Sequence, residues 1–265
     1  MKQDKISGAS EIERKATNYI KNYLGKKELF NKCYRLLSLY PSMASIWNIA
    51  NFAFLYGKKA IKKFEEMERA NKKVIENGIK FFEKYKTVLT YSRSSVLSKI
   101  LQNCNVKVIC SEGRPRYEGR LLAKELGNKA VLTADAMLFS FVEKADFVAV
   151  GADAILGKGI VNKVGTYALA LVAKEKKKPF IVFASTFKTF PFVFIKEENP
   201  NEIWRNAPVK IKNFYFDFTP ANLISFFITE NGMEKYPSFE YEIADEIFKI
   251  RKLLKRGGYY FLNGD

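Results

Sequence analysis

Residues 147–166, FVAVGADAILGKGIVNKVGT, begin with four apolar residues and then place Gly151 and Asp153 directly after them. The run Phe147–Val150 is typical of a strand buried in the core of a sheet. Ligands of open α/β folds bind where strands leave the sheet, so Gly151 and Asp153 occupy a favoured position for a site. This stretch therefore predicts both a parallel sheet and a ligand pocket at its edge.

The second half of the stretch predicts a helix start that attracts an anion. We expect Lys163, Gly165 and Thr166 to begin the next helix, with Asn162 beside them. A helix start has unpaired backbone N–H groups and a positive dipole end, and a lysine adds a full charge, so phosphate can dock there. Asp153 would face that anion across the turn.

Two simpler interpretations of the same stretch stay open. A nucleotide-binding phosphate loop needs four residues between its glycines and a Ser or Thr after its Lys. Here five residues separate Gly151 from Gly157, and Gly159 follows Lys158, so the spacing does not match. The other alternative is a turn in which the glycines only shape the backbone, with Asp153 as a structural carboxylate that caps it. We favour the structural role for Asp153.

The second part of the chain alternates between predicted strands and predicted helices. Short runs rich in β-type residues occur at 87–90, 106–110, 130–133, 147–150 and 179–183. The segments between them are long enough for crossover helices, which we expect at 92–102, 117–126, 135–143 and 163–178. We predict a Rossmann-like parallel-sheet domain over residues 86–265.

The first third of the chain has helical rather than strand periodicity. Four apolar stripes recur at helical spacing, and they start near Ile12, Leu29, Met43 and Ile61. We therefore predict an α/β protein in which an N-terminal helical domain, residues 1–85, packs directly on the sheet domain.

The strand ends bring several polar residues to one edge of the predicted sheet. Their order along the chain is Ser92 and Arg93, Arg114, Asp135, Asp153 and Lys188. Because parallel strands end at the same edge, these side chains should share one rim. Arg114 can grip a phosphate bidentately and Lys188 can supply a point charge. The alternative is a set of ordinary surface Arg and Lys residues in loops.

Composition limits the classes of function. The chain has 265 residues, 48% of them hydrophobic. Its three cysteines lack metal-ligand spacing and it has no histidine, which argues against a zinc site or a Cys-His nucleophile, so we expect no metal and no cofactor. We expect a cytoplasmic protein, because residues 1–14 lack a signal-peptide core and no apolar run is long enough for a membrane span. The net charge of +17 favours polyanionic partners, although much of it lies in mixed Lys/Glu stretches typical of a solvated face.

The last third of the chain is rich in aromatic residues, which include Phe190, Phe192, Phe194, Trp204, Phe214, Phe216, Phe226 and Phe227. This is more aromatic surface than one sheet edge easily hides, so we predict that it forms a dimer interface. The alternative is a second core layer.

Blocks spread along the chain resemble a known family. They are Gly8-Ala9-Ser10, Pro41-Ser42-Met43-Ala44-Ser45, the segment 88–94, Ser111-Glu112-Gly113-Arg114-Pro115 with Gly119, the segment 147–166, Phe187-Lys188, Asp217-Phe218-Thr219-Pro220 and Ile228-Thr229-Glu230. In this order they are similar to the α, β and δ regulatory subunits of translation initiation factor two-B, their archaeal relatives, and the isomerases of methylthioribose 1-phosphate and ribose 1,5-bisphosphate.

The resemblance also implies that this chain lacks one catalytic residue of the isomerases. The resembled isomerases use a cysteine directly after a Thr-His pair, together with the aspartate that matches Asp153. This chain has Thr90-Tyr91-Ser92 there. A thiol exchanges a proton near neutral pH, whereas a serine hydroxyl needs an activating base.

We therefore expect an archaeal-type, noncatalytic subunit that self-associates and docks on the α subunit of initiation factor two. It should bind a sugar phosphate or nucleoside monophosphate, and the expected ligand-binding residues are Arg93, Arg114, Asp153, Asn162, Lys163 and Lys188. The alternative is a sugar-phosphate isomerase that uses Asp153 and Ser92.

Overall fold

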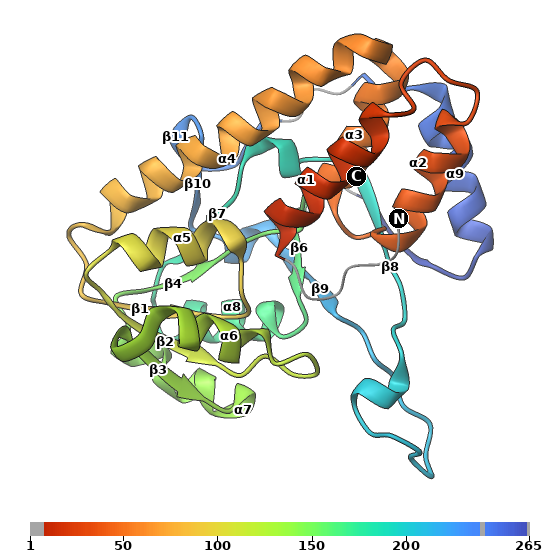
Figure 1. The fold of residues 1–265 in the computed structure, drawn as a ribbon. Helices are drawn as coiled ribbons and strands as arrows, with labels where there is room; N and C mark the ends of the chain where they lie inside the picture. The colour runs from red at the N-terminus through yellow and green to blue at the C-terminus, as the bar shows by residue number, and fades with distance from the viewer. Residues whose placement is uncertain (1–7, 239–241, 264–265) are drawn as a thin grey trace.

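The structure is a computed structural model that describes residues 8–238 and 242–263. It has an N-terminal group of helices beside a mostly parallel sheet, with the long helix α4 running along both (Figure 1). The α-helices are α1 (Ala9–Lys21), α2 (Leu29–Leu39), α3 (Ala44–Tyr56), α4 (Ala60–Phe82), α5 (Ser95–Asn103), α6 (Glu118–Leu126), α7 (Asp135–Leu138), α8 (Thr166–Glu175) and α9 (Asp245–Arg256). The predicted α/β class, with helices first and a parallel sheet after them, is confirmed.

The central sheet has seven strands in the order β11-β10-β7-β4-β1-β2-β3. All neighbours are parallel except the edge pair β10 and β11. Its strands are β1 (Thr87–Thr90), β2 (Lys107–Ser111), β3 (Ala130–Thr133), β4 (Phe147–Val150), β7 (Phe180–Phe183), β10 (Phe226–Thr229) and β11 (Gly232–Glu234). The five predicted strands are all present, and β10 adds a sixth parallel one. The carboxyl ends of the parallel strands therefore meet at one edge.

Alternating side chains of the strands pack against two helical layers. Val88, Phe147 and Phe183 face a cluster that includes α4, α5 and α6. Leu89 and Val148 face the opposite cluster, which includes α7 and α8. Both faces are covered, which explains why these strands are apolar throughout rather than amphipathic.

A third core joins the two predicted domains. Apolar side chains of α1, α2 and α3 pack with those of α9 and with three short strands of the sheet half of the chain, β5 (Ala154–Leu156), β6 (Gly159–Lys163) and β8 (Phe192–Ile195). β5, β6 and β9 (Phe216–Pro220) form a separate antiparallel sheet, and β8 pairs with β12 (Tyr260–Asn263). Packing thus crosses the predicted boundary at residue 85, and the division into 1–85 and 86–265 stays a prediction.

Several predicted helix starts are wrong by a few residues. The helix expected from Ser92 begins at Ser95, because the Ser94 side chain accepts the Leu97 N–H as an N-cap. The helix expected from Lys163 begins at Thr166, because Lys163 is the last residue of β6 and pairs with Phe216 in β9. The predicted helix 135–143 is α7 followed by a 3₁₀ segment, Phe139–Lys144.

The aromatic residues of the last third mostly belong to the interior. Phe190, Phe192, Phe194 and Phe227 are fully buried. Trp47 of α3 stacks on Phe190 and Phe194, so a second core layer explains these rings. They cannot form the predicted dimer interface. Trp204, in contrast, is 57% exposed. It belongs to the segment between β8 and β9, which projects from the body in Figure 1.

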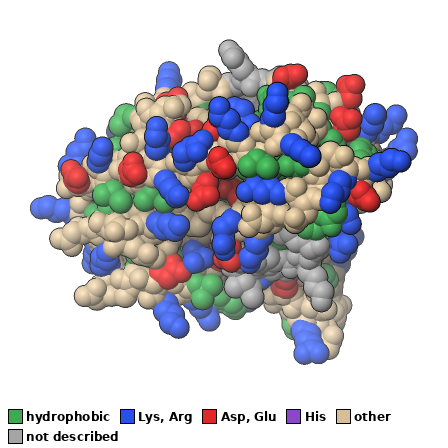
Figure 2. All heavy atoms as spheres, turned by 45° about the horizontal axis from the view of Figure 1, so that its top comes forward, with side chains coloured by type: hydrophobic (Ala, Val, Ile, Leu, Met, Phe, Trp, Pro, Cys, Tyr) green, Lys and Arg blue, Asp and Glu red, His purple; other side chains and the backbone are tan. Residues whose placement is uncertain are grey.

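Basic side chains on the face crossed by α4 are interspersed with acidic ones (Figure 2). On α4 itself Lys63 pairs with Glu66, and Lys72 pairs with Glu68. Such exposed pairs stabilise a protein little, and they are typical of a solvated face. No helix within residues 8–238 and 242–263 is both long and apolar enough to cross a membrane.

Candidate functional site: a cavity at the carboxyl edge of the sheet

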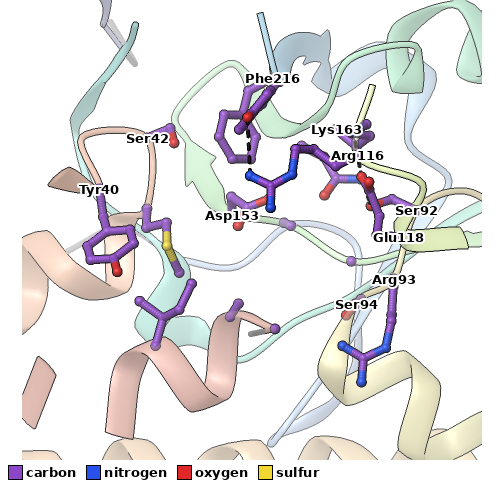
Figure 3. A pocket seen from close by; sticks show the side chains of 18 of the residues that line it. Tyr40, Ser42, Ser92, Arg93, Ser94, Arg116, Glu118, Asp153, Lys163 and Phe216 are labelled. Carbon is purple, nitrogen blue, oxygen red and sulfur yellow. Dashed lines mark hydrogen bonds and ion pairs between the residues drawn. The ribbon is translucent and has the colours of Figure 1, made fainter. Parts of the chain in front are cut away.

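A cavity of about 290 Å³ lies where the helical group meets the carboxyl edge of the sheet (Figure 3). Its lining comes from the start of α1, the loop between α2 and α3, the loops after β1 and β4, strand β6, and Lys188. The volume is at the small end of what a small-molecule site requires. Ser92, Arg93, Asp153, Asn162, Lys163 and Lys188, all predicted from the sequence, line it.

Asp153 is fixed through its backbone and not through its carboxylate. Its N–H donates to the carbonyl of Val161 at 2.8 Å, and its carbonyl accepts the N–H of Ala44 at 2.9 Å. Among the described residues the carboxylate makes no hydrogen bond or ion pair. The predicted role as a cap of the turn is therefore wrong, and the carboxylate is left to face the cavity.

The environment of Asp153 favours its neutral form. Burial raises the pKa of this carboxyl from 3.8 to about 6. The ammonium of Lys188 opposes the shift, the carboxylates of Glu13 and Glu118 add to it, and Lys163 opposes it weakly. A carboxyl group with a pKa near neutrality can both accept and donate a proton to a bound hydroxyl.

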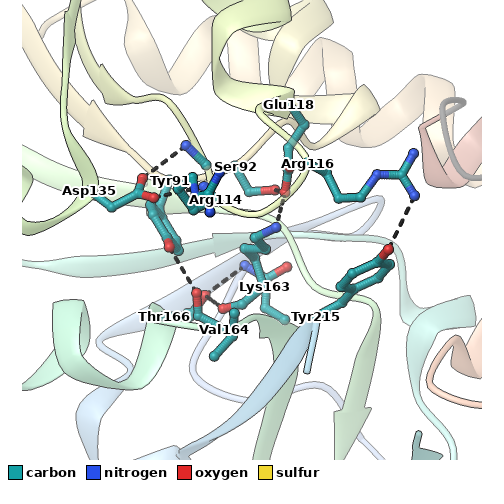
Figure 4. Close-up of polar contacts among 12 residues, drawn as sticks. Tyr91, Ser92, Arg114, Arg116, Glu118, Asp135, Lys163, Val164, Thr166 and Tyr215 are labelled. Carbon is teal, nitrogen blue, oxygen red and sulfur yellow. Dashed lines mark hydrogen bonds and ion pairs between the residues drawn. The ribbon is translucent and has the colours of Figure 1, made fainter. Parts of the chain in front are cut away.

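Ser92 and Lys163 share one carboxylate (Figure 4). Lys163 Nζ lies 2.5 Å from Glu118 Oε1, and Ser92 Oγ donates to the same oxygen at 3.2 Å. Ser92 has a φ of 67°, a left-handed conformation that is strained for a residue with a side chain. Such strain is common where surrounding contacts hold a residue in place for function.

Lys188 forms a second, more deeply buried pair. Its Nζ lies 3.2 Å from Glu13 Oε1, and the two side chains are only 6% and 8% exposed. Asn71 of α4 donates to the other oxygen of Glu13 at 3.0 Å. Glu13 belongs to α1, so the helical group supplies the counter-ion of a cavity lysine.

The arginines do not lie as the sequence predicted. Arg93 lies at the cavity, but its guanidinium pairs with Glu125 at 2.5 Å and lies apart from the Lys163 cluster in Figure 3. Arg114 is not among the lining residues, because its side chain donates to the carbonyl of Ile203 at 3.1 Å and to the Tyr117 hydroxyl. Arg116 lines the cavity instead and donates to the Tyr215 hydroxyl at 3.2 Å.

The loop that carries these arginines is tightly fixed. The N–H groups of Gly113 and Arg114 both donate to Asp135, at 2.8 and 2.7 Å. Asp135 thus supports the loop from the neighbouring strand end, without lining the cavity. A Cβ at Gly119 would lie 1.8 Å from the Ser111 carbonyl oxygen, so only glycine lets α6 approach β2 this closely.

The predicted anion site at the start of α8 is occupied by the protein itself. Asp217 of β9 accepts the N–H groups of Gly165 and Tyr167 at 2.6 and 3.3 Å. Burial raises the pKa of Asp217 to about 6, while these two hydrogen bonds act in the opposite direction. The Asn162 side chain lines the cavity, and its amide donates to the Thr166 hydroxyl at 3.1 Å. An anion would therefore have to bind elsewhere in the cavity.

Among the described residues, every basic side chain that lines the cavity lies within 4 Å of a carboxylate. The pairs are Arg93 with Glu125, Arg116 with Glu202, Lys163 with Glu118, Lys188 with Glu13, and Lys196 with Glu198. No cysteine lines the cavity, and Cys33, Cys104 and Cys110 are buried elsewhere. Within residues 8–238 and 242–263 no three His, Cys, Asp or Glu side chains cluster as ligands of a metal ion would.

Four residues at the site are not predicted from the sequence: Glu13, Arg116, Glu118 and Tyr215. Arg116 and Glu118 follow the family-like segment 111–115 within three residues, which is the only sequence signal for them. Glu13 carried no signal, because a single acid on an amphipathic helix is typical of a solvated face.

Comparison with known proteins now identifies the family. Residues 9–235 match the model of the Initiation factor 2 subunit family. This chain belongs to that family. It is 33% identical to ribose 1,5-bisphosphate isomerase of Methanocaldococcus jannaschii, over 88% of each chain. It is 32% identical to the putative translation initiation factor eIF-2B subunit 2-like protein of Pyrococcus furiosus, over 88% of this chain and 93% of the relative.

A solved structure agrees with this placement. The chain is similar to translation initiation factor eIF-2B of Pyrococcus horikoshii, with a TM-score of 0.76 and 28% identity over 89% of this chain and 94% of that one. The family therefore contains both translation factors and isomerases, and overall similarity does not choose between the two functions.

Proposed function

We propose that this chain is a noncatalytic subunit of the initiation-factor-two-B type that binds a phosphorylated small molecule in the cavity. A sugar phosphate or nucleoside monophosphate fits the available groups, a carboxyl at Asp153 for hydroxyls and the cations Lys188, Lys163 and Arg116 for phosphate. We further propose that it acts in the cytoplasm, self-associates, and contacts the α subunit of initiation factor two.

The observation that carries the proposal is the state of Ser92. It stands where the resembled isomerases have a cysteine, and its hydroxyl already donates to Glu118 at 3.2 Å. Isomerisation of ribose 1,5-bisphosphate to a ketose breaks the bond from C1 to the ring oxygen and moves a hydrogen from C2 to C1, which takes an acid for the ring oxygen and a base for the C2 hydroxyl. The oxygen of Glu118 that accepts the serine hydroxyl is also the one that lies 2.5 Å from Lys163 Nζ, so it is already shared between two donors.

A second candidate, an isomerase of the ribose 1,5-bisphosphate type, has one observation in its favour. Asp153 has a pKa of about 6, and its carboxylate makes no hydrogen bond or ion pair with residues 8–238 and 242–263, so it is available as a general base. It would have to serve both ends of the proton transfer alone.

The deciding assay incubates the purified chain with ribose 1,5-bisphosphate and follows the product by phosphorus NMR. We expect turnover at least about a hundredfold slower than a cysteine-containing isomerase of the family, because one acid-base partner is typically worth that much. Ser92→Cys should raise the rate if the rest of the site is intact. Rapid turnover by the wild type, abolished by Asp153→Asn, would establish the isomerase instead.

Binding is tested separately by thermal shift with ribose 1,5-bisphosphate and AMP. A ligand at a hundred times its Kd adds about 2.7 kcal/mol to the free energy of unfolding, which a melting curve detects. Arg116→Ala and Arg114→Ala form a matched pair, because only the first side chain lines the cavity. We expect Arg116→Ala to lose more of the shift. No shift with either ligand would leave protein contacts as the function, to be measured by binding to the α subunit of initiation factor two.

A further inference from the structure

The buried pair of Glu13 and Lys188 connects the cavity to the helical group. Glu13 lies on α1 and Lys188 follows β7, so two segments far apart in sequence meet at one wall. Asn71 of α4 holds the second oxygen of Glu13. The start of α1 is also fixed to α5, since Ser10 N–H donates to Ser95 Oγ at 3.1 Å.

In this arrangement the Glu13 carboxylate and the phosphate of a ligand would compete for the ammonium of Lys188. Lys188 is 5% exposed, so it has little room for a second counter-ion beside Glu13. Charges in such a poorly hydrated site interact strongly, and a phosphate close to the Glu13 carboxylate would be repelled by it. A phosphate that reaches Lys188 must therefore displace Glu13 or bind beside it at a penalty.

We infer that Glu13 sets the affinity of the cavity for anionic ligands, and that ligand binding releases α1 from Lys188. The inference rests on the proposed binding of a phosphorylated molecule. It adds that the helical group senses occupancy, because α1 loses its buried ion pair when the ligand takes Lys188. Glu118 differs in this respect, since it pairs with Lys163 within the sheet half of the chain.

The test compares Glu13→Gln with the wild type by calorimetric titration of ribose 1,5-bisphosphate and AMP. Glutamine keeps the size and an acceptor for Asn71 but removes the charge. We expect the Kd of the variant to be about tenfold lower, the effect of removing one repelling charge from a poorly hydrated site. Glu11→Gln is the matched control, because Glu11 pairs with Lys15 on the exposed side of the same helix, and it should leave the Kd unchanged.

Hydrogen exchange on the same proteins tests the release of α1. In the wild type, saturating ribose 1,5-bisphosphate should speed amide exchange in α1, whereas in Glu13→Gln the ligand should change it little. If Glu13→Gln does not melt cooperatively, Asn71→Ser replaces it. This variant removes the hydrogen bond that holds the carboxylate and should lower the Kd by about two- to threefold.

The outcomes separate the two proposals. A wild type that binds a ligand while Glu13→Gln binds it no more tightly overturns the competition and leaves the proposed function standing. A ligand that binds only to Glu13→Gln supports competition in its strongest form. No binding to any of the proteins overturns both the competition and the proposed ligand binding, and it leaves protein contacts as the function.

Discussion

The two ends of strand β4 carry aspartates with opposite surroundings. At the amino end, Asp146 accepts hydrogen bonds from the N–H groups of Thr87 and Lys86, both at 2.8 Å. These bonds lower the pKa of its carboxyl, with the bond from Thr87 as the largest cause. At the other end, three residues past the strand, Asp153 has no such donor within residues 8–238 and 242–263, and burial raises its pKa to about 6.

This difference separates a stabilising edge from a functional one. At the amino edge the Asp146 carboxylate accepts two backbone hydrogen bonds, so its charge stabilises the folded chain. The carboxyl edge keeps the Asp153 carboxylate, a strained Ser92 and the ion pairs of two buried lysines together around a cavity. Such features persist only when the surrounding structure holds them, and they cluster where ligands bind.

The largest expected effect comes from breaking a buried pair at the functional edge. Lys188→Met leaves Glu13 charged, buried and without its lysine, which should lower the free energy of unfolding by about 3–5 kcal/mol. Lys72→Met is the matched control. Lys72 pairs with Glu68 on the surface of α4, so its loss should change stability by about 0.5 kcal/mol or less. Urea denaturation measures both variants, and similar values for the two would contradict a buried charge pair at Lys188.

The strands of the central sheet are easier to predict from the sequence than the site at their carboxyl edge. The apolar runs at 87–90, 130–133 and 147–150 specify strands by composition alone, and they form β1, β3 and β4 with the predicted bounds. The hairpin of β5 and β6 is not evident from the sequence, because Gly157 and Lys158 are compatible with any glycine-shaped turn. β10 is not evident either, because the aromatic pair Phe226 and Phe227 suits an interface as well as a strand.

Within the site, the residues that follow strands could be predicted and their partners could not. Ser92, Asp153 and Lys188 come after strands, and parallel strands end at one edge, so topology brings them together. Glu13 reaches Lys188 only because α1 packs across the edge, a contact between residues 175 positions apart. No local sequence pattern encodes such a contact. The sequence therefore predicts a site with the lysines but without the Glu13 carboxylate, which is more positive than the site in the structure.

The second prediction concerns Asp153, whose ionisation opposes folding. Its pKa in the folded chain is raised, so its contribution to stability is fully present below pH 3.8 and is lost as the pH rises through about 6. Asp153→Asn should therefore raise the free energy of unfolding by about 2–3 kcal/mol at pH 8 and by only about 0.5 kcal/mol at pH 4. Urea titrations at the two pH values check this, and an unchanged or lower stability at pH 8 would mean that the carboxylate has a stabilising partner.

The smallest effect, with the opposite sign, is expected at Asp146. Its pKa is lowered, so its contribution is present above the ordinary value of 3.8 and is lost as the pH falls through the folded value. Asp146→Asn keeps an acceptor oxygen but weakens two charge-assisted hydrogen bonds at an exposed site, where solvent screening limits the loss. We expect the free energy of unfolding to fall by about 0.5–1 kcal/mol at pH 7, and the difference from the wild type to shrink towards pH 3. The same urea titrations serve here. If Asp146→Asn and Asp153→Asn shift stability in the same direction at neutral pH, the two edges of the sheet do not differ in the way their hydrogen bonds indicate.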